Sequence, residues 1–221
     1  MRHCNCAWGL VLACLLVAAA GRATPGATEE KKAEDGLVQL FNGKDLTGWK
    51  SHPDDKAKWE VVDGTIIGTG PAGHLFSERG DYENFRFRIE AKINDEGNSG
   101  QYFRATYAKA FPPGYEAQIN STHGDPIRSG SLYPDSRDGY SEEERKMMIV
   151  RDQLVKPDEW FTQEVIANGN HIVIKLNGKT TVDFVDERRR HAKGHFAFQQ
   201  HNEGSVVTIR KAEVKEFPPS K

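Results

Sequence analysis

The chain has 221 residues, of which 30 are Lys or Arg and 32 are Asp or Glu, giving a formal net charge of −2 at pH 7. A chain this close to neutrality lacks the basic excess that nucleic acids and anionic membranes attract, so neither is a predicted partner. Its length allows one well-buried domain once an N-terminal leader and linker are set aside.

Residues 1–23, MRHCNCAWGLVLACLLVAAAGRA, have the anatomy of a secretory signal peptide. A short basic start precedes an almost unbroken apolar run that ends in small residues and is too short to span a bilayer comfortably. We therefore predict a secreted or periplasmic protein, and a lipid anchor on Cys14 is the one membrane attachment that this pattern leaves open. All cysteines lie in this leader, at Cys4, Cys6 and Cys14, so the mature chain is expected to form no disulfide.

Residues 24–36 are small, polar and charged, which predicts a flexible linker ahead of a domain at residues 37–218. The domain begins with a hairpin that turns at Asp63-Gly64. Residues 84–93 then alternate apolar and charged side chains, as a half-buried strand does. Further strands are predicted at residues 99–106, 115–120, 160–186 (a three-stranded meander), 195–201 and 205–217.

One helix is expected at residues 141–148, where Ser141 and Glu144 fit a capping box. It falls within a long connection, residues 122–159, which we expect to lie over one face or rim of the domain as a lid or binding loop. About ten short strands with a single short helix predict an all-β fold, a two-sheet antiparallel sandwich.

The strand at residues 115–120 carries an unusual row of polar side chains on one face. Glu116, Gln118 and Asn120 alternate with apolar residues that point to the other face. A solvent-washed edge strand and a carbohydrate-binding groove would both accommodate such a row, so the strand alone does not decide between them.

Polar residues recur at strand spacing in three further segments: Asn98, Ser99, Tyr102 and Arg104; His123, Ser129 and Tyr133; Gln199 and His201. Each has an ordinary structural explanation. Arg104 and Glu116 could form a cross-strand salt bridge, and His201 could be a hydrogen-bonded edge residue. Together they would form the kind of polar sheet face with which sandwiches bind sugars. An exposed Trp160 could stack on a pyranose ring.

Several segments occur along the chain in a recognisable order: LFNGKDLTGWK, WEVVDGTIIGTG with HLFSERGDYENFRFRIEAKI, GNSGQYFRA, GYEAQI, SGSLY, EWFTQEVIANGNHIVIKLNG and HFAFQQHNEG. Together they resemble the 3-keto-disaccharide hydrolase domain family, over residues 37–217. The resemblance implies a concanavalin-like (laminarinase-like) jelly-roll sandwich of the lectin and glucanase type, secreted by bacteria. It also implies activity on glycosides whose glucose unit carries a ketone at C3.

The resemblance places the family's polar segments on Asn98, Ser99, Gly100 and Arg104, on Tyr115, Glu116 and Gln118, on Ser129, Gly130, Leu132 and Tyr133, and on Gln199, His201 and, less well, Gly204. The last match is imperfect because Asn202 and Glu203 are extra here. The charged insert PDSRDGYSEEERKMMIVRDQ is longer than the family pattern, which bears on the lid and on substrate size. The predicted substrate-binding residues are Asn98, Ser99, Gln118, Ser129, Tyr133, Gln199 and Trp160.

Ordinary laminarinase-like hydrolysis needs two carboxylates, whereas here Glu116 is followed on its face by amides, which cannot ionise. A 3-keto sugar requires only a base for the acidified C2 hydrogen, a stabiliser for the enolate oxygen and an acid for the leaving group. We predict Glu116 as base, Arg104 as stabiliser and His201 or Tyr133 as proton donor. Arg104 is expected to keep Glu116 ionised, and the roles of Glu116 and His201 could be exchanged.

No metal or other cofactor is predicted, and two alternatives stay open. Glu116, His201 and His123 could gather around a divalent ion that polarises the ketone, although the sequence has no tight ligand spacing. The protein could also be a non-catalytic, lectin-like carbohydrate-binding module, because the same sandwich fold serves both classes.

Overall fold

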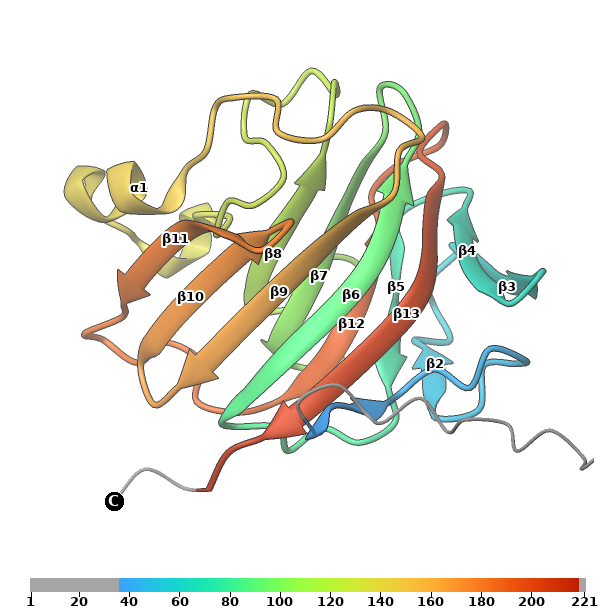
Figure 1. Cartoon of the computed structure of the whole chain (residues 1–221), viewed down its shortest axis with the longest axis horizontal. Helices are drawn as coiled ribbons and strands as arrows, with labels where there is room; N and C mark the ends of the chain where they lie inside the picture. The colour runs from blue at the N-terminus through green and yellow to red at the C-terminus, as the bar shows by residue number, and fades with distance from the viewer. Residues whose placement is uncertain (1–35, 219–221) are drawn as a thin grey trace, which may run out of the picture. The chain divides into compact units, whose positions relative to one another are not determined.

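The computed structural model describes residues 36–218 (Figure 1). The predicted signal peptide and nearly all of the predicted linker lie outside the described residues. The described part contains strands β1 to β13, one short 3-10 helix, η2 (Ser136–Asp138), and one α-helix, α1 (Glu142–Met148). No helix in this part is long and apolar enough to cross a membrane.

The strands form two antiparallel sheets that pack face to face. The larger, eight-stranded sheet runs in the order β11 (Lys179–Val185), β10 (His171–Leu176), β9 (Phe161–Asn168), β6 (Phe85–Ile93), β13 (Val207–Glu216), β4 (Thr65–Thr69) and β3 (Lys58–Val62), with β1 (Val38–Gln39) also paired to β13. The five-stranded sheet runs in the order β2 (Trp49–Ser51), β5 (Gly73–Ser77), β12 (His195–Gln200), β7 (Asn98–Ala105) and β8 (Tyr115–Asn120).

The core between the sheets is aromatic, and β6 supplies much of it. Every second residue of β6 is buried, because side chains alternate between the two faces of a strand. Phe196 of β12 packs against three aromatic rings: it stacks on Phe87 and Tyr82, with ring centroids 4.0 and 4.1 Å apart, and meets Phe85 edge-on at 4.7 Å. These contacts join the middle of the five-stranded sheet to the eight-stranded one.

The outer face of the five-stranded sheet is covered as well, although β8 presents polar side chains there. All six residues of β8 and all eight of β7 are buried. Glu116 is only 8% exposed and Gln118 only 1%. The polar row on β8 therefore does not belong to a solvent-washed edge strand, and the segments that cover it create a candidate site.

The long connection, residues 121–160, provides part of this cover. Leu132 forms a β-bridge with Ala117 of β8, and the Tyr133 N–H donates to the Glu116 carbonyl at 2.8 Å. Helix α1 lies beside β11 (Figure 1). The predicted capping box is present, since Ser141 and Glu144 each accept a hydrogen bond from the other's N–H.

The two antiparallel sheets and the single short helix confirm the predicted sandwich. Backbone hydrogen bonds tie the covering connection to β8, and the Leu132 N–H ties α1 to that connection by donating to the Met148 carbonyl. The cover over this sheet face is therefore well anchored.

Phe196→Ala tests whether the aromatic core holds the two sheets together. We expect it to lower the free energy of unfolding by about 3–5 kcal/mol, because it removes three ring contacts from a fully buried position. Urea titration followed by fluorescence measures the change. Leu154→Ala, at a side chain that is 42% exposed, is the control and should change the stability by less than about 0.5 kcal/mol. Equal effects of the two substitutions would contradict this account of the core.

Candidate functional site

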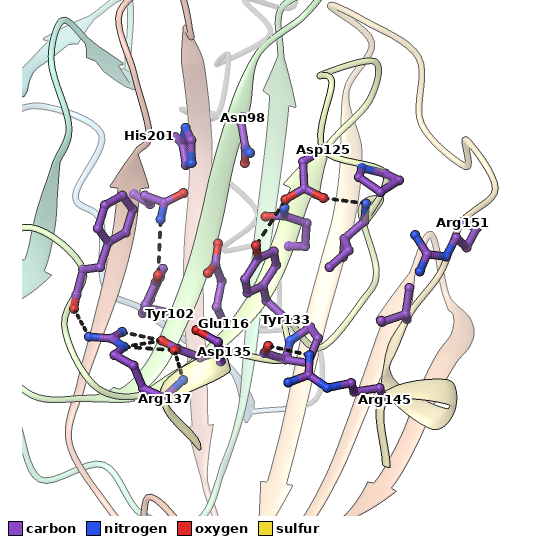
Figure 2. A pocket seen from close by; sticks show the side chains of 18 of the residues that line it. Asn98, Tyr102, Glu116, Asp125, Tyr133, Asp135, Arg137, Arg145, Arg151 and His201 are labelled. Carbon is purple, nitrogen blue, oxygen red and sulfur yellow. Dashed lines mark hydrogen bonds and ion pairs between the residues drawn. The ribbon is translucent and has the colours of Figure 1, made fainter. Parts of the chain in front are cut away.

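A cavity of about 1010 Å³ lies over the outer face of the five-stranded sheet (Figure 2). Its floor comes from β7, β8 and β12, and its walls come from the 106–114 loop and the long connection. The polar and aromatic lining residues are Asn98, Tyr102, Phe111, Glu116, Gln118, Asp125, Tyr133, Asp135, Ser136, Arg137, Glu142, Arg145, Lys146, Arg151, Gln199 and His201. Its size is that of a small-molecule site.

Glu116 occupies the floor of the cavity, where it lies over Gly100 of the neighbouring strand. A Cβ at Gly100 would overlap the Glu116 carboxyl group, so glycine is required there to seat it. Burial raises the pKa of Glu116 to about 8; the hydrogen bond with the Tyr102 hydroxyl opposes this rise, and the charges of Asp135 and Asp125 add to it. Glu116 therefore carries a proton at neutral pH.

His201 follows directly after β12, and its ring is hydrogen-bonded to the next residue. Its Nδ1 lies 2.8 Å from Asn202 Oδ1. The Asn202 amide is oriented by two further hydrogen bonds: its Nδ2 donates to the Glu203 carbonyl at 2.8 Å, and its Oδ1 accepts from the Ser205 hydroxyl at 3.1 Å. Since Asn202 offers an acceptor, Nδ1 of the neutral imidazole carries the hydrogen and Nε2 keeps its lone pair.

Two amide oxygens at the cavity lack partners among the described residues. Asn98 Oδ1 and Gln199 Oε1 are buried and accept no hydrogen bond, although both side chains line the cavity. The Gln199 amide nitrogen donates to the Tyr102 hydroxyl at 3.2 Å, which directs its oxygen elsewhere. Buried acceptors without a donor are costly, so these two oxygens are suited to the hydroxyl groups of a bound molecule.

The walls carry two further polar pairs. Tyr133 donates its hydroxyl to Asp125 Oδ2 at 3.2 Å, and burial, with the nearby Asp125 and Glu116, raises the pKa of Tyr133 to about 12. Asp135 accepts from Arg137 Nε with both carboxylate oxygens at 2.9 Å. Each aspartate is thus already engaged by a neighbour, and Glu116 is the proton-holding carboxyl group at the floor.

Residues 36–215 match the family described as the 3-keto-alpha-glucoside-1,2-lyase-like domain. The chain belongs to this family. A protein of Bacteroides thetaiotaomicron named 3-keto-disaccharide hydrolase is 32% identical over 83 residues, which make up 32% of this chain and 28% of that protein. The match thus spans less than a third of that relative's length.

Two solved structures illustrate the fold of this lyase-like domain. A protein of Parabacteroides distasonis, provisionally described as a glycosyl hydrolase, superposes with a TM-score of 0.62 at 24% identity, covering 87% of this chain and 99% of that one. The carbohydrate binding module CBM66 of Bacillus subtilis has a TM-score of 0.56 at 12% identity, covering 76% and 96%. At these identities the likeness shows the sandwich alone.

Six of the ten predicted site residues of this lyase-like domain line the cavity: Asn98, Glu116, Gln118, Tyr133, Gln199 and His201. They come from three adjacent strands and from the covering connection, and the alternation of side chains along each strand is what directs them outward. The four others, Ser99, Arg104, Ser129 and Trp160, are not among the lining residues.

Arg104 turns away from the cavity because β7 contains a bulge. Tyr102 pairs with Ala197 and Ala105 with His195, so β7 has one residue more than β12 over this stretch. Arg104 sits in the bulge with φ 51°. Its guanidinium donates to the Glu83 carbonyl at 2.6 and 2.9 Å and to the His191 carbonyl at 3.2 Å. The expected Arg104–Glu116 pair is not formed, and the geometry does not support Arg104 as the enolate stabiliser.

The other three residues have structural surroundings of their own. The Ser99 hydroxyl donates to the Gln199 carbonyl at 2.6 Å, and the Ser129 hydroxyl bonds to the backbone of Asn120. Trp160 packs under the cations Arg210 and Lys92, which belong to the eight-stranded sheet. None of the three is therefore placed to touch a ligand in this cavity.

The expectation missed the residues that the 106–114 loop and the long connection contribute: Phe111, Asp125, Asp135 and Arg151 from irregular segments, Arg137 from η2, and Arg145 and Lys146 from helix α1. Loop residues follow no period, so no spacing in the sequence indicates which of them face the sheet. The unusual length and charge of the connection was the one signal that it could contribute to a site.

The three candidate metal ligands do not form a metal site. Across residues 36–218, no group of three or more His, Cys, Asp or Glu side chains is placed to hold an ion. His123 Nδ1 lies 3.3 Å from Asn98 Nδ2 instead, and His201 Nδ1 lies against Asn202. The residues present therefore do not fit a divalent ion, and we derive no step through one.

Glu116→Gln tests the burial of this carboxyl group through stability. In the unfolded chain the group ionises near pH 4.5, whereas in the folded protein it keeps its proton up to about pH 8. The free energy of unfolding of the parent should therefore fall as pH rises from about 4.5 to about 8, while the glutamine variant escapes this loss. The free energy of unfolding of the variant minus that of the parent should therefore be larger at and above pH 8 than at pH 4, by on the order of 3–5 kcal/mol.

Urea unfolding of both proteins at several pH values measures this difference. Glu60→Gln, which neutralises an exposed carboxylate on β3, is the control and should show no such trend. A stability difference that stays constant with pH would mean that Glu116 is ionised in the folded protein.

Proposed function

We propose that the protein cleaves 3-keto-glucosides by elimination across C1 and C2 of the oxidised sugar. The observation that supports this most directly is the joint presence, in one cavity, of a carboxyl group that holds its proton and an imidazole whose Nε2 lone pair is free. The carboxyl group is suited to act as a general acid and the imidazole as a general base. The family to which the chain belongs supports the choice of substrate.

In this proposal His201 and Glu116 exchange the roles expected from sequence. His201 Nε2 removes the proton from C2, and the electron pair moves to the C3 carbonyl, giving an enolate. The enolate then re-forms the ketone, a C1–C2 double bond develops, and the bond from C1 to the leaving oxygen breaks. Glu116 gives its proton to that oxygen. Solvent then returns a proton from His201 to Glu116.

The products of this step are a free alcohol or sugar and a 3-keto sugar with a double bond between C1 and C2. Addition of water across that double bond completes a net hydrolysis. The same chemistry thus accounts for both a lyase and a hydrolase outcome. With Arg104 outside the cavity, we assign the contact with the enolate oxygen to the Gln118 amide, which is on the floor beside Glu116.

Sugar binding in this scheme rests on amides and one aromatic ring. Asn98 Oδ1 and Gln199 Oε1 are free to accept from sugar hydroxyls. Phe111, 45% exposed, lines the cavity with its ring 5.9 Å from that of His201. Its carbonyl accepts from Arg137 Nη1 at 2.9 Å, which fixes the loop. We assign to Phe111 the stacking role that the sequence suggested for Trp160.

The pH dependence of turnover tests the assignment of roles. With para-nitrophenyl 3-keto-α-glucoside, kcat/KM should fall above about pH 8, because Glu116 must hold its proton. A Glu116 base would give the opposite result, a rate that rises through about pH 8. Glu116→Gln and His201→Gln should each lower kcat by about 100-fold or more. His171→Gln, on the exposed side of the other sheet, is the control and should leave the rate unchanged.

Substrate chemistry provides the second part of this test. Deuterium at C2 should give a primary isotope effect, and the unoxidised glucoside should not be cleaved. Binding of sugars without any turnover would favour the carbohydrate-binding alternative. Cleavage of the unoxidised glucoside at a comparable rate would contradict the elimination mechanism.

Phe111→Ala tests the stacking assignment. Removing the ring should raise KM about fivefold and leave kcat nearly unchanged, because an aromatic contact of about 1 kcal/mol is lost in both ground and transition states. Steady-state kinetics on the same substrate measures it, with Leu154→Ala, outside the cavity, as the matched exposed apolar control. An unchanged KM would remove Phe111 from the site.

A further inference from the structure

One wall of the cavity is cationic. Arg145, Lys146 and Arg151 all line it, and they all come from helix α1 or the residues that follow it. In Figure 2, Arg145 and Arg151 lie on the opposite side of the view from His201, with Glu116 and Tyr133 between them. The cavity thus has an end rich in amides and imidazole and a separate cationic end.

The acidic residues of the lining do not cancel this charge. Asp135 is matched by Arg137, which binds both of its oxygens. Glu116 is uncharged at neutral pH because it is buried. Asp125 and Glu142 remain as charged acids against Arg145, Lys146 and Arg151, and Asp125 already accepts from Tyr133 and from the Ile127 N–H.

Arg145 is held in place by groups that leave its charge uncompensated. Its Nε donates to the Tyr140 carbonyl and its Nη1 to the Pro134 carbonyl, each at 3.3 Å. These acceptors are neutral, so the guanidinium remains a net cation with Nη2 available for a ligand. The helix that carries it is itself fixed, because Glu144 accepts from Arg190 at 2.8 Å. A guanidinium positioned in this way is suited to bind an oxyanion.

We infer that the leaving part of the substrate carries an anionic oxygen group, such as a carboxylate, sulfate or phosphate, that binds at Arg145 and Arg151. This inference rests on the proposed function, since the acid and base place the oxidised glucose at the other end of the cavity. The leaving group then extends past Glu116 towards α1. Substrates with an anionic leaving part are bound at both ends, whereas neutral ones are bound at the sugar end alone.

The test compares two substrates of nearly the same shape and different charge, the anionic para-carboxyphenyl and the neutral para-carbamoylphenyl 3-keto-α-glucosides. We expect the parent to prefer the carboxylate by about tenfold in kcat/KM, a preference that shrinks as salt is added. Arg145→Gln and Arg151→Gln should each reduce the preference, and the double variant should abolish it. Turnover of the carboxamide should stay within about twofold of the parent, because its leaving part meets no ionic contact.

Arg210→Gln, which removes a cation from the eight-stranded sheet, is the matched control and should keep the full preference. The inference is overturned if the parent does not prefer the carboxylate. It is also overturned if Arg145→Gln lowers kcat/KM equally for both substrates, because Arg145 would then act in the chemistry or in folding. Calorimetric binding of both compounds to Glu116→Gln separates the two proposals. Preferential binding of the carboxylate supports the inference even where no cleavage occurs, and equal binding overturns it.

Discussion

The chemistry of this site depends on one constraint, the burial of the Glu116 carboxyl group without a cation beside it. Gly100 provides the space, because any Cβ there would occupy the position of the carboxyl group. The Tyr102 hydroxyl supplies a hydrogen bond, but burial and the charges of Asp135 and Asp125 outweigh it. The group therefore keeps its proton at neutral pH and is an acid before any substrate binds. An arginine next to Glu116 would have favoured the ionised carboxylate and made Glu116 a weak base. The assignment of acid and base therefore follows from the residues that surround this one carboxyl group.

The cation is absent because of a local change in strand geometry. Plain alternation along β7 would have placed Arg104 on the same face as Tyr102, pointing into the cavity. The extra residue in the bulge changes its direction, and the guanidinium bonds the Glu83 and His191 carbonyls instead. Arg104 thereby ties two loops to the end of the sheet. Because of this one additional residue in β7, Arg104 stabilises the fold and does not face the cavity.

Regular alternation of side chains along the strands separates what the sequence predicted from what it missed. Regular alternation identified the two-sheet sandwich and the outward row of Glu116 and Gln118, and the capping box located α1. Alternation failed at Arg104, where the bulge interrupts it. It also gives no information on hydrogen bonding, and the Ser99 and Ser129 hydroxyl groups donate to backbone carbonyls. Trp160 was misplaced because an aromatic residue before a strand can belong to either sheet. The loop residues of the cavity follow no period, so their inward direction became visible only when the loops were seen over the sheet.

The covering connection is bonded to the same strand that carries the acid. The Tyr133 N–H donates to the Glu116 carbonyl, and the Leu132 N–H donates to the Met148 carbonyl at the end of α1, at 2.9 Å. Behind the cavity, Glu144 and Asp186 both bind Arg190, and Asp186 accepts the Tyr115 hydroxyl from β8. The cationic wall on α1 is therefore connected to the floor through backbone hydrogen bonds and a buried ionic network. Because the backbone of this scaffold sets the position of Glu116, we expect side chains on α1 to be replaceable without moving the carboxyl group. In the proposed mechanism, the recognised leaving group could then differ while the acid and the base stay the same.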